Sequence, residues 1–219
     1  MLQSMNIQFG NFIEKLMASF IEKTNNYIVV ENLSGASNKK FTLSTENNKI
    51  INNYLTMCQT KNFNDKELEG NFQKLLKDIF FNKNNGEMLE FQHDVDLLFK
   101  EKNSNKYYYV EIKFNDDHDT DKFLAINRKF IQTSAYLFNE LSLKNYSELT
   151  PILFYFNNKK MKGNIYVPER TNIRRGQSFF EEFLNIKYSD LEKIFKDFSE
   201  QSEIREMFDN LYKDVMKIN

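Results

Sequence analysis

The sequence predicts a mixed α/β domain in which a central mixed sheet is flanked by helices. Residues 89–99 and 107–114 alternate apolar with polar side chains, which is the period-two pattern of β-strands. The segments on both sides of these runs carry apolar residues at helical spacing instead. The chain has 219 residues, of which 41% are hydrophobic, so it can bury a sizeable core and is not disordered.

Three helices are predicted ahead of the two strand-like runs. Ser4 is a suitable N-cap for the first helix, and residues 9–21 supply its apolar stripe. Ser44 and Asp65 are suitable N-caps for the second and third helices. Residues 27–30, between the first and second helices, are either a short strand or the tail of a helix.

The runs 89–99 and 107–114 are joined by a polar, turn-prone segment, so we expect them to pair as antiparallel neighbours. Three polar side chains then meet on one face of the sheet: Asp96, Glu111 and Lys113. Two carboxylates and an ammonium group at this spacing can hold a Mg²⁺ ion and handle a water molecule, as phosphodiester hydrolysis requires. The alternative is the solvated face of a hairpin with a cross-strand ion pair.

The rest of the chain alternates again between helix and strand. A polar loop, 115–121, leads into a helix over 123–138. Residues 151–156 are typical of a buried strand, and residues 164–167 are its expected partner. From Gln177 onwards the pattern is helical, in two or three pieces.

Composition excludes several classes of protein. One cysteine and two histidines exclude a disulfide framework and argue against a zinc centre. No stretch approaches the roughly 20 apolar residues of a membrane span, and the N-terminus lacks a signal peptide, so we expect a cytoplasmic protein. The net charge is −1, yet residues 157–176 hold six Lys and Arg residues against one Glu, and clustered charge suits nucleic-acid binding.

The combination of an acidic strand position, a hairpin and a Glu-x-Lys strand resembles the PD-(D/E)xK nuclease superfamily. The matching residues are Asp96, just before an apolar run, and Glu111-Ile112-Lys113.

Glu14 is similar to the extra glutamate that many of these nucleases carry on an upstream helix. Gln132 and Tyr136 are similar to the Gln-xxx-Tyr element of RecB-like members. Val95 replaces the proline of the motif, which leaves Asp94 as an alternative to Asp96.

The resemblance implies a role for each of these residues. Asp96, Glu111 and the backbone carbonyl of Ile112 would hold a Mg²⁺ ion. Lys113 would orient or deprotonate the attacking water, and the second role requires a pKa well below the usual value of about 10.4. Glu14 would hold a water molecule or a second metal ion. Asp96 is preferred to Asp94 because the metal-binding Asp of the family stands immediately before the apolar run.

Two groups of residues are candidates for contact with DNA. Gln132 and Tyr136 lie four residues apart on one helix face and can position a phosphate, although Tyr136 suits the core equally well. The second group consists of side-chain types that make bidentate base contacts: Arg170, Asn172, Arg174, Arg175 and Gln177. The alternatives for this group are non-specific phosphate binding or a solvated loop.

The resemblance implies a type II restriction endonuclease that cuts both strands of a short DNA site and leaves 5′-phosphates. One domain, 1–219, would contain a catalytic core at about 4–156, a DNA-recognition segment at about 157–178 and C-terminal helices at 179–219. A homodimer is expected because a two-fold protein reads a symmetric site most simply, and a cognate DNA methyltransferase is implied. The alternatives are a structure-specific repair nuclease or resolvase of the same superfamily and a non-enzymatic α/β interaction module.

Overall fold

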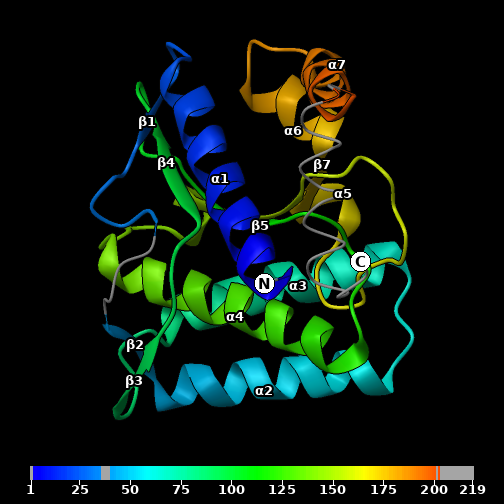
Figure 1. Ribbon diagram of the computed structural model, residues 1–219. Helices are drawn as coiled ribbons and strands as arrows, with labels where there is room; N and C mark the ends of the chain where they lie inside the picture. The colour runs from blue at the N-terminus through cyan, green and yellow to red at the C-terminus, as the bar shows by residue number, and fades with distance from the viewer. Residues whose placement is uncertain (1, 36–39, 201, 203–219) are drawn as a thin grey trace.

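The centre of the structure is a five-stranded sheet with the strand order β1-β4-β5-β6-β7. The computed structural model describes residues 2–35, 40–200 and 202. The strands of this sheet are β1 (Tyr27–Val29), β4 (Leu97–Glu101), β5 (Tyr107–Lys113), β6 (Leu149–Tyr155) and β7 (Ile173–Arg175). Strands β1, β4 and β5 pair antiparallel, whereas β5, β6 and β7 pair parallel. The predicted mixed sheet with helices on its faces is confirmed (Figure 1).

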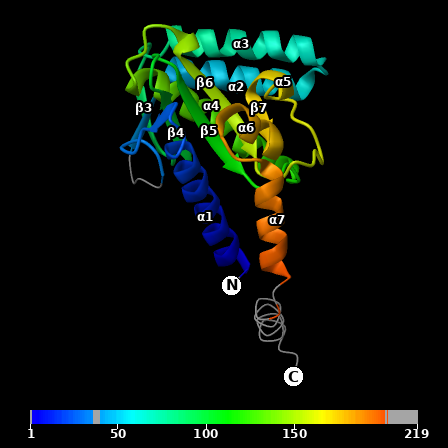
Figure 2. The same ribbon diagram turned by 90° about the horizontal axis from the view of Figure 1, so that it is seen from above.

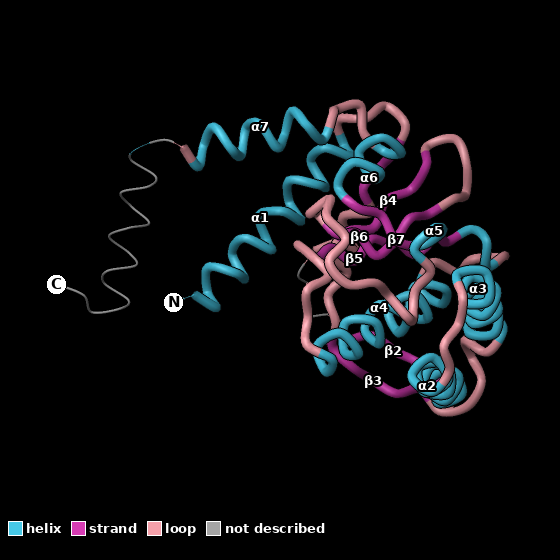
Figure 3. The backbone as a smooth tube through the Cα atoms, turned by 90° about the vertical axis from the view of Figure 1, so that its right-hand side faces the viewer, coloured by secondary structure: helices cyan, strands magenta, loops and turns pink. Residues whose placement is uncertain are grey.

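One face of the sheet is covered by α1 (Leu2–Glu22), α6 (Gly176–Phe183) and α7 (Tyr188–Ser199). Its core joins apolar side chains of α1 to those of the strands and of α6: Ile13, Met17, Ile21, Val110, Ile112, Phe154, Phe179 and Phe183. Figures 2 and 3 show that α1 and α7 extend away from the sheet in the same direction.

The opposite face is covered by α2 (Thr45–Thr60), α3 (Asp65–Phe81) and α4 (Thr120–Glu140). Helix α4 contacts the sheet, and α2 and α3 pack against α4. The apolar side chains of these helices form one core with the strand residues that point to this face, among them Leu98, Tyr109, Leu153 and Tyr155. Two short helical elements flank β6 in the sequence: η1 (Tyr146–Glu148) precedes it and α5 (Glu169–Asn172) follows it. The sheet is therefore buried on both faces, as a parallel segment requires.

The prediction of one strand over 89–99 is wrong. The run is divided between β3 (Met88–Gln92) and β4, and β3 pairs with β2 (Lys40–Ser44) in a separate two-stranded sheet. In β3 the side chains are exposed or half-buried, whereas Leu97, Leu98 and Phe99 of β4 are completely buried. Periodicity alone cannot separate two apolar runs that follow one another in the sequence. A strand such as β4, which is buried on both faces, does not alternate.

Of the three predicted helix caps, only Ser44 is confirmed. Ser4 is not the N-cap of α1, because that helix already begins at Leu2 and contains Ser4 in its first turn. Ser44 caps α2 by accepting a hydrogen bond from the backbone N–H of Asn47, as predicted. The cap of α3 is Asn64 rather than Asp65, because Asn64 forms a reciprocal capping box with Glu67.

The later strands and the termini differ more from prediction. Residues 27–30 do contain a strand, β1, but residues 164–167 are irregular, and β7 is the partner of β6. Helices α6 and α7 confirm the helical pattern after Gln177, and the remainder of the predicted C-terminal helices lies outside the described residues. Within the described part of the chain, no helix is long and apolar enough to cross a membrane.

Gly176 lies at the junction of β7 and α6, where the chain passes close to two other segments. An added Cβ would lie 2.8 Å from the backbone oxygen of Phe156 and would also overlap the ring of Tyr188. We predict that Gly176→Ala lowers the free energy of unfolding by about 1–3 kcal/mol, because a backbone oxygen cannot move aside cheaply. Chemical denaturation measures this change.

Gly70 provides the matched control for this substitution. It is exposed within α3, and an added Cβ there would have no neighbour within 4 Å. Gly70→Ala should therefore raise the free energy of unfolding by about 0.5–1 kcal/mol through helix propensity. A Gly176→Ala protein as stable as the wild type would contradict the close packing described here.

Candidate active site

The pairing of β4 with β5 brings together the polar residues that the sequence singled out. Leu97 pairs with Val110, so the same register places Asp96, one residue earlier, beside Glu111. Lys113 lies on the same face of β5. Its Nζ is 2.8 Å from Glu111 Oε1 and 3.3 Å from Asp96 Oδ2. The predicted juxtaposition is present, whereas the chemical roles of these residues remain predictions.

Ile112 ties the two strands together at this point. Its backbone N–H donates to Asp96 Oδ2 at 2.8 Å, and its carbonyl oxygen accepts from Lys113 Nζ at 2.8 Å. The Lys113 ammonium is thus surrounded by oxygens of Asp96, Glu111 and Ile112, the three predicted metal ligands. Such hard oxygen donors are those that Mg²⁺ prefers, so the residues fit a divalent cation.

The group contains two carboxylates and one carbonyl rather than a larger acidic cluster. Among the described residues, no three His, Cys, Asp or Glu side chains are grouped so that they could hold a metal ion. Two carboxylates are nevertheless enough for Mg²⁺, which keeps several of its waters in protein sites.

Lys129 is a residue of this site that the sequence analysis missed. It comes from α4, and its Nζ lies 2.9 Å from Glu111 Oε1 and 3.4 Å from Asp96 Oδ1. In the sequence it resembles any lysine on the polar side of a helix. The available signal was its position one turn before Gln132, on the helix face already singled out.

The interior position of the carboxylates depends on these cations. Glu111 is completely buried and Asp96 is 7% exposed. Glu111 receives a third hydrogen bond, from the hydroxyl of Tyr109 to Oε2 at 2.7 Å. An ionised carboxylate in such surroundings is tolerated only when it is paired and hydrogen-bonded, as it is here.

The pKa shifts follow from this mixture of burial and charge. Burial and the neighbouring charge of Glu111 raise the pKa of Asp96, and the two lysines oppose that rise. Burial alone would raise the pKa of Glu111 as well, but Lys113 and Lys129 lower it to about 2. Burial disfavours the Lys113 ammonium, yet the two carboxylates outweigh it and raise the pKa of Lys113. The low pKa that a general-base lysine requires is therefore not found.

Glu14 of α1 faces the same group of charges. Burial, followed by the nearby charge of Asp96, raises the pKa of the Glu14 carboxyl to about 7.

The two candidate aspartates differ in their burial. Asp94 is exposed between β3 and β4, whereas Asp96 is buried against Ile112. The structure therefore places Asp96, rather than Asp94, in the group of converging charges.

The two residues of the Gln-xxx-Tyr element differ in their surroundings. Gln132 is half-buried, and its amide oxygen lies 3.4 Å from a ring nitrogen of His93. Tyr136 is 5% exposed and stacks on Phe41 with ring centroids 4.0 Å apart. Tyr136 is thus a core aromatic, which is the alternative that the sequence analysis left open.

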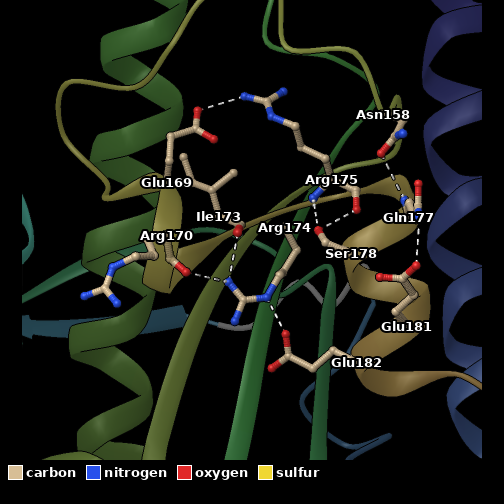
Figure 4. Close-up of a pocket in the computed structure, with 10 residues that line it drawn as sticks. All are labelled: Asn158, Glu169, Arg170, Ile173, Arg174, Arg175, Gln177, Ser178, Glu181 and Glu182. Atoms are coloured by element: carbon tan, nitrogen blue, oxygen red, sulfur yellow. Dashed lines mark hydrogen bonds and ion pairs between the residues drawn. The ribbon is translucent and has the colours of Figure 1, made fainter.

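The predicted recognition segment lines a surface pocket of about 470 Å³ (Figure 4). Four of the five residues that were predicted to contact bases line this pocket: Arg170, Arg174, Arg175 and Gln177. Each arginine is paired with a carboxylate, Arg170 with Glu69 and Arg174 with Glu182. Figure 4 also shows Gln177 directed toward Glu181.

The fifth candidate, Asn172, is part of the packing instead. It is 2% exposed, and its amide donates to the backbone oxygen of Pro151 at 2.8 Å. The expectation that Asn172 contacts a base is therefore corrected, because its hydrogen-bonding groups face the interior. Arg175 is also largely enclosed, since its Nη2 lies 2.9 Å from Asp116 Oδ2 and 2.8 Å from Glu169 Oε1.

The sheet register connects this pocket with the acidic group. Lys113, Tyr155 and Arg175 are opposite one another on the parallel strands β5, β6 and β7. Neighbouring strands are about 4.8 Å apart, so the backbones of Lys113 and Arg175 are separated by about 10 Å. Both features lie at the carboxyl ends of the parallel strands, where open α/β sheets bind their ligands.

Comparison with known proteins places the chain in a family. The family model described as "Type II restriction endonuclease, HinfI" matches residues 1–199. The type II restriction enzyme HinfI of Haemophilus influenzae is 49% identical over 215 residues, which cover 98% of this chain and 80% of that enzyme. No solved structure matches.

Arg175 connects the segment 157–178 to the loop after β5 through its ion pair with Asp116, so its loss should weaken the fold. We predict that Arg175→Met lowers the free energy of unfolding by about 3 kcal/mol, because Asp116, 1% exposed, would lose its charged partner. Arg170→Met should change it by less than about 0.5 kcal/mol, since that side chain is 78% exposed. Equal stability of the two variants would contradict the structural role of Arg175.

This difference should depend on pH. Burial alone would raise the pKa of Asp116, but the Met161 amide and the Arg175 guanidinium outweigh it and lower the pKa. Stabilisation from ionised Asp116 is therefore complete above its unfolded pKa of about 4 and is lost as the pH falls through the lower folded pKa. The wild type and Arg175→Met should thus converge in stability below about pH 4.

Proposed function

The chain belongs to the HinfI family of type II restriction endonucleases, and we propose that Asp96, Glu111 and Lys113 are the residues with which it hydrolyses DNA. The substrate is double-stranded DNA, cut at a short specific sequence. The observation that carries this proposal is the convergence of three oxygens on one cation position, with further charges from α1 and α4 around it. The metal ion that we propose is Mg²⁺.

Each residue of the site has a definable task in this proposal. Asp96, Glu111 and the carbonyl of Ile112 would hold the ion. A bound Mg²⁺ ion polarises the scissile phosphate and makes a water molecule more acidic. Lys113 keeps its proton at neutral pH because its pKa is raised, so it donates hydrogen bonds to the attacking water and to the phosphate rather than acting as a base.

Glu14 would hold a water molecule at the edge of the same site. A carboxyl group with a pKa of about 7 exchanges a proton readily near neutral pH, which suits a group in contact with a reacting water. Gln132 lies on the helix that supplies Lys129, so we retain it as a contact to the DNA backbone. For Tyr136 the buried stacking on Phe41 supports a packing role instead.

Sequence recognition is assigned to the segment 157–178. Arg170, Arg174 and Gln177 line the pocket, and Arg170 and Gln177 are exposed, so these side chains are accessible from solvent. Arginine recognises guanine and glutamine recognises adenine through bidentate hydrogen bonds in the major groove. On binding DNA, Arg170 and Arg174 would exchange their intramolecular ion pairs for contacts to DNA.

Two partners follow from cleavage of both strands at a specific site. A homodimer presents one active site to each strand of a symmetric sequence, which is why we propose a two-fold assembly. A cognate DNA methyltransferase would have to protect the host DNA, since the same sequence occurs there. We further propose that residues 1–219 form one nuclease domain, with the core at about 4–156.

The catalytic assignment predicts a sharp difference between neighbouring acidic residues. Glu111→Ala and Asp96→Asn should reduce the cleavage rate of phage DNA at least about 1000-fold, because each removes an oxygen ligand of the metal ion. Asp94→Asn should stay within about threefold of wild type. Gel assays with and without Mg²⁺ give the rates, and thermal unfolding checks that each variant is folded. Discrete bands from Glu111→Ala would refute the assignment.

The recognition assignment is tested on the cut sequence itself. Gln177→Ala should slow cleavage of the mapped site by about 10–100-fold and relax the choice of base at one position, since a bidentate base contact contributes about 1–3 kcal/mol. Gln73→Ala, at an exposed position of α3, is the control and should cleave like the wild type. An unchanged site preference for Gln177→Ala would exclude that residue as a base reader.

A further inference from the structure

The candidate active site contains a second lysine from a different element than the lysine of the family motif. Lys113 belongs to β5, whereas Lys129 belongs to α4 and reaches the carboxylates from the helix layer. The Lys129 ammonium contacts both of them, Glu111 Oε1 at 2.9 Å and Asp96 Oδ1 at 3.4 Å. Its side chain is 26% exposed, so it also has access to solvent.

The charges of this group are balanced by these lysines. Two carboxylates face two ammonium groups, each within 3.4 Å of both carboxylates. Unit charges at these distances interact strongly in partly buried surroundings. A divalent cation that binds the same oxygens therefore meets strong repulsion from the ammonium of Lys129. A DNA phosphate beside the site would supply the negative charge that relieves it.

We propose that Lys129 is a positioning residue that couples the binding of the divalent cation to the binding of DNA. It holds Asp96 and Glu111 in place and balances their charge in the DNA-free enzyme. When DNA binds, its ammonium turns to the phosphate and leaves the carboxylate oxygens to the cation. This inference rests on the proposed function, because it assumes that Asp96 and Glu111 are the metal ligands.

Lys113 is less suited to this coupling because its ammonium occupies the proposed ion position itself, so the ion must displace it whether or not DNA is bound. Its ammonium donates to the carbonyl of Ile112 as well as to the two side chains. Lys129 pairs with the two carboxylates from across the helix–sheet boundary. Removal of Lys129 leaves Glu111 with two of its donors, Lys113 and Tyr109, so the folded site can persist.

The test measures Mg²⁺ binding to the DNA-free protein. Mg²⁺ is titrated calorimetrically into the wild type, Lys129→Met, Lys129→Arg and a control, Lys77→Met, which removes an exposed charge from α3. We expect Lys129→Met to bind Mg²⁺ about tenfold more tightly than the wild type, because a repelling charge is gone. Lys129→Arg and Lys77→Met should stay within about threefold of the wild type.

A second measurement follows the other half of the coupling. Without metal, in EDTA, Lys129→Met should bind a duplex containing the mapped site at least about tenfold more weakly, because the carboxylates then repel the phosphates. Cleavage with Mg²⁺ should fall in Lys129→Met and be partly restored in Lys129→Arg. The Lys77→Met protein should match the wild type in both measurements.

The outcomes separate this inference from the proposed function. Mg²⁺ affinity of Lys129→Met equal to or weaker than that of the wild type would overturn the coupling, as would a loss of thermal stability with unchanged Mg²⁺ affinity. If Lys129→Met does not fold, Lys129→Gln replaces it with the same expectation. A wild-type protein that binds Mg²⁺ but cleaves no DNA would refute the proposed function instead.

Discussion

The buried carboxylates of Asp96 and Glu111 constrain the structure around them. Glu111 has no exposed surface, and it remains ionised only because two ammonium groups and one tyrosine hydroxyl surround it. Those donors come from β5 and α4, so the strand register and the docking of the helix must both be correct. A shift of one residue in either element would leave a buried charge without its partner.

This arrangement is not one that stability alone would select. Replacing a buried ion-pair group by well-packed apolar residues is often neutral or stabilising in proteins, because the desolvation of charges is costly. The surrounding sheet is strongly apolar on both faces and could hold such residues. We therefore explain the charged group by the proposed catalytic role, and the membership of the chain in a restriction endonuclease family agrees with that proposal.

The parallel half of the sheet connects this group with the segment assigned to recognition. Strands β5, β6 and β7 end in one row, so the proposed catalytic group and the arginine-lined pocket share one edge of the sheet. Within the segment, Asn172 and Arg175 attach the backbone to the protein body, while Arg170 and Gln177 remain exposed. Attachment to the protein body and the proposed contact with DNA are thus divided between residues of the same chemical types, only a few positions apart.

The sequence by itself determined the local features, because they depend on spacing along the chain. The period of residues 107–114, the Ser44 cap and the nearness of Asp96 to Glu111 follow from short-range rules and one hairpin. Tertiary structure decided which elements face one another: the entry of Lys129 from α4, the division of residues 89–99 between two sheets and the burial of Asn172. Periodicity shows which face of an element is apolar, whereas the partner packed against that face is set by contacts between residues distant in the sequence.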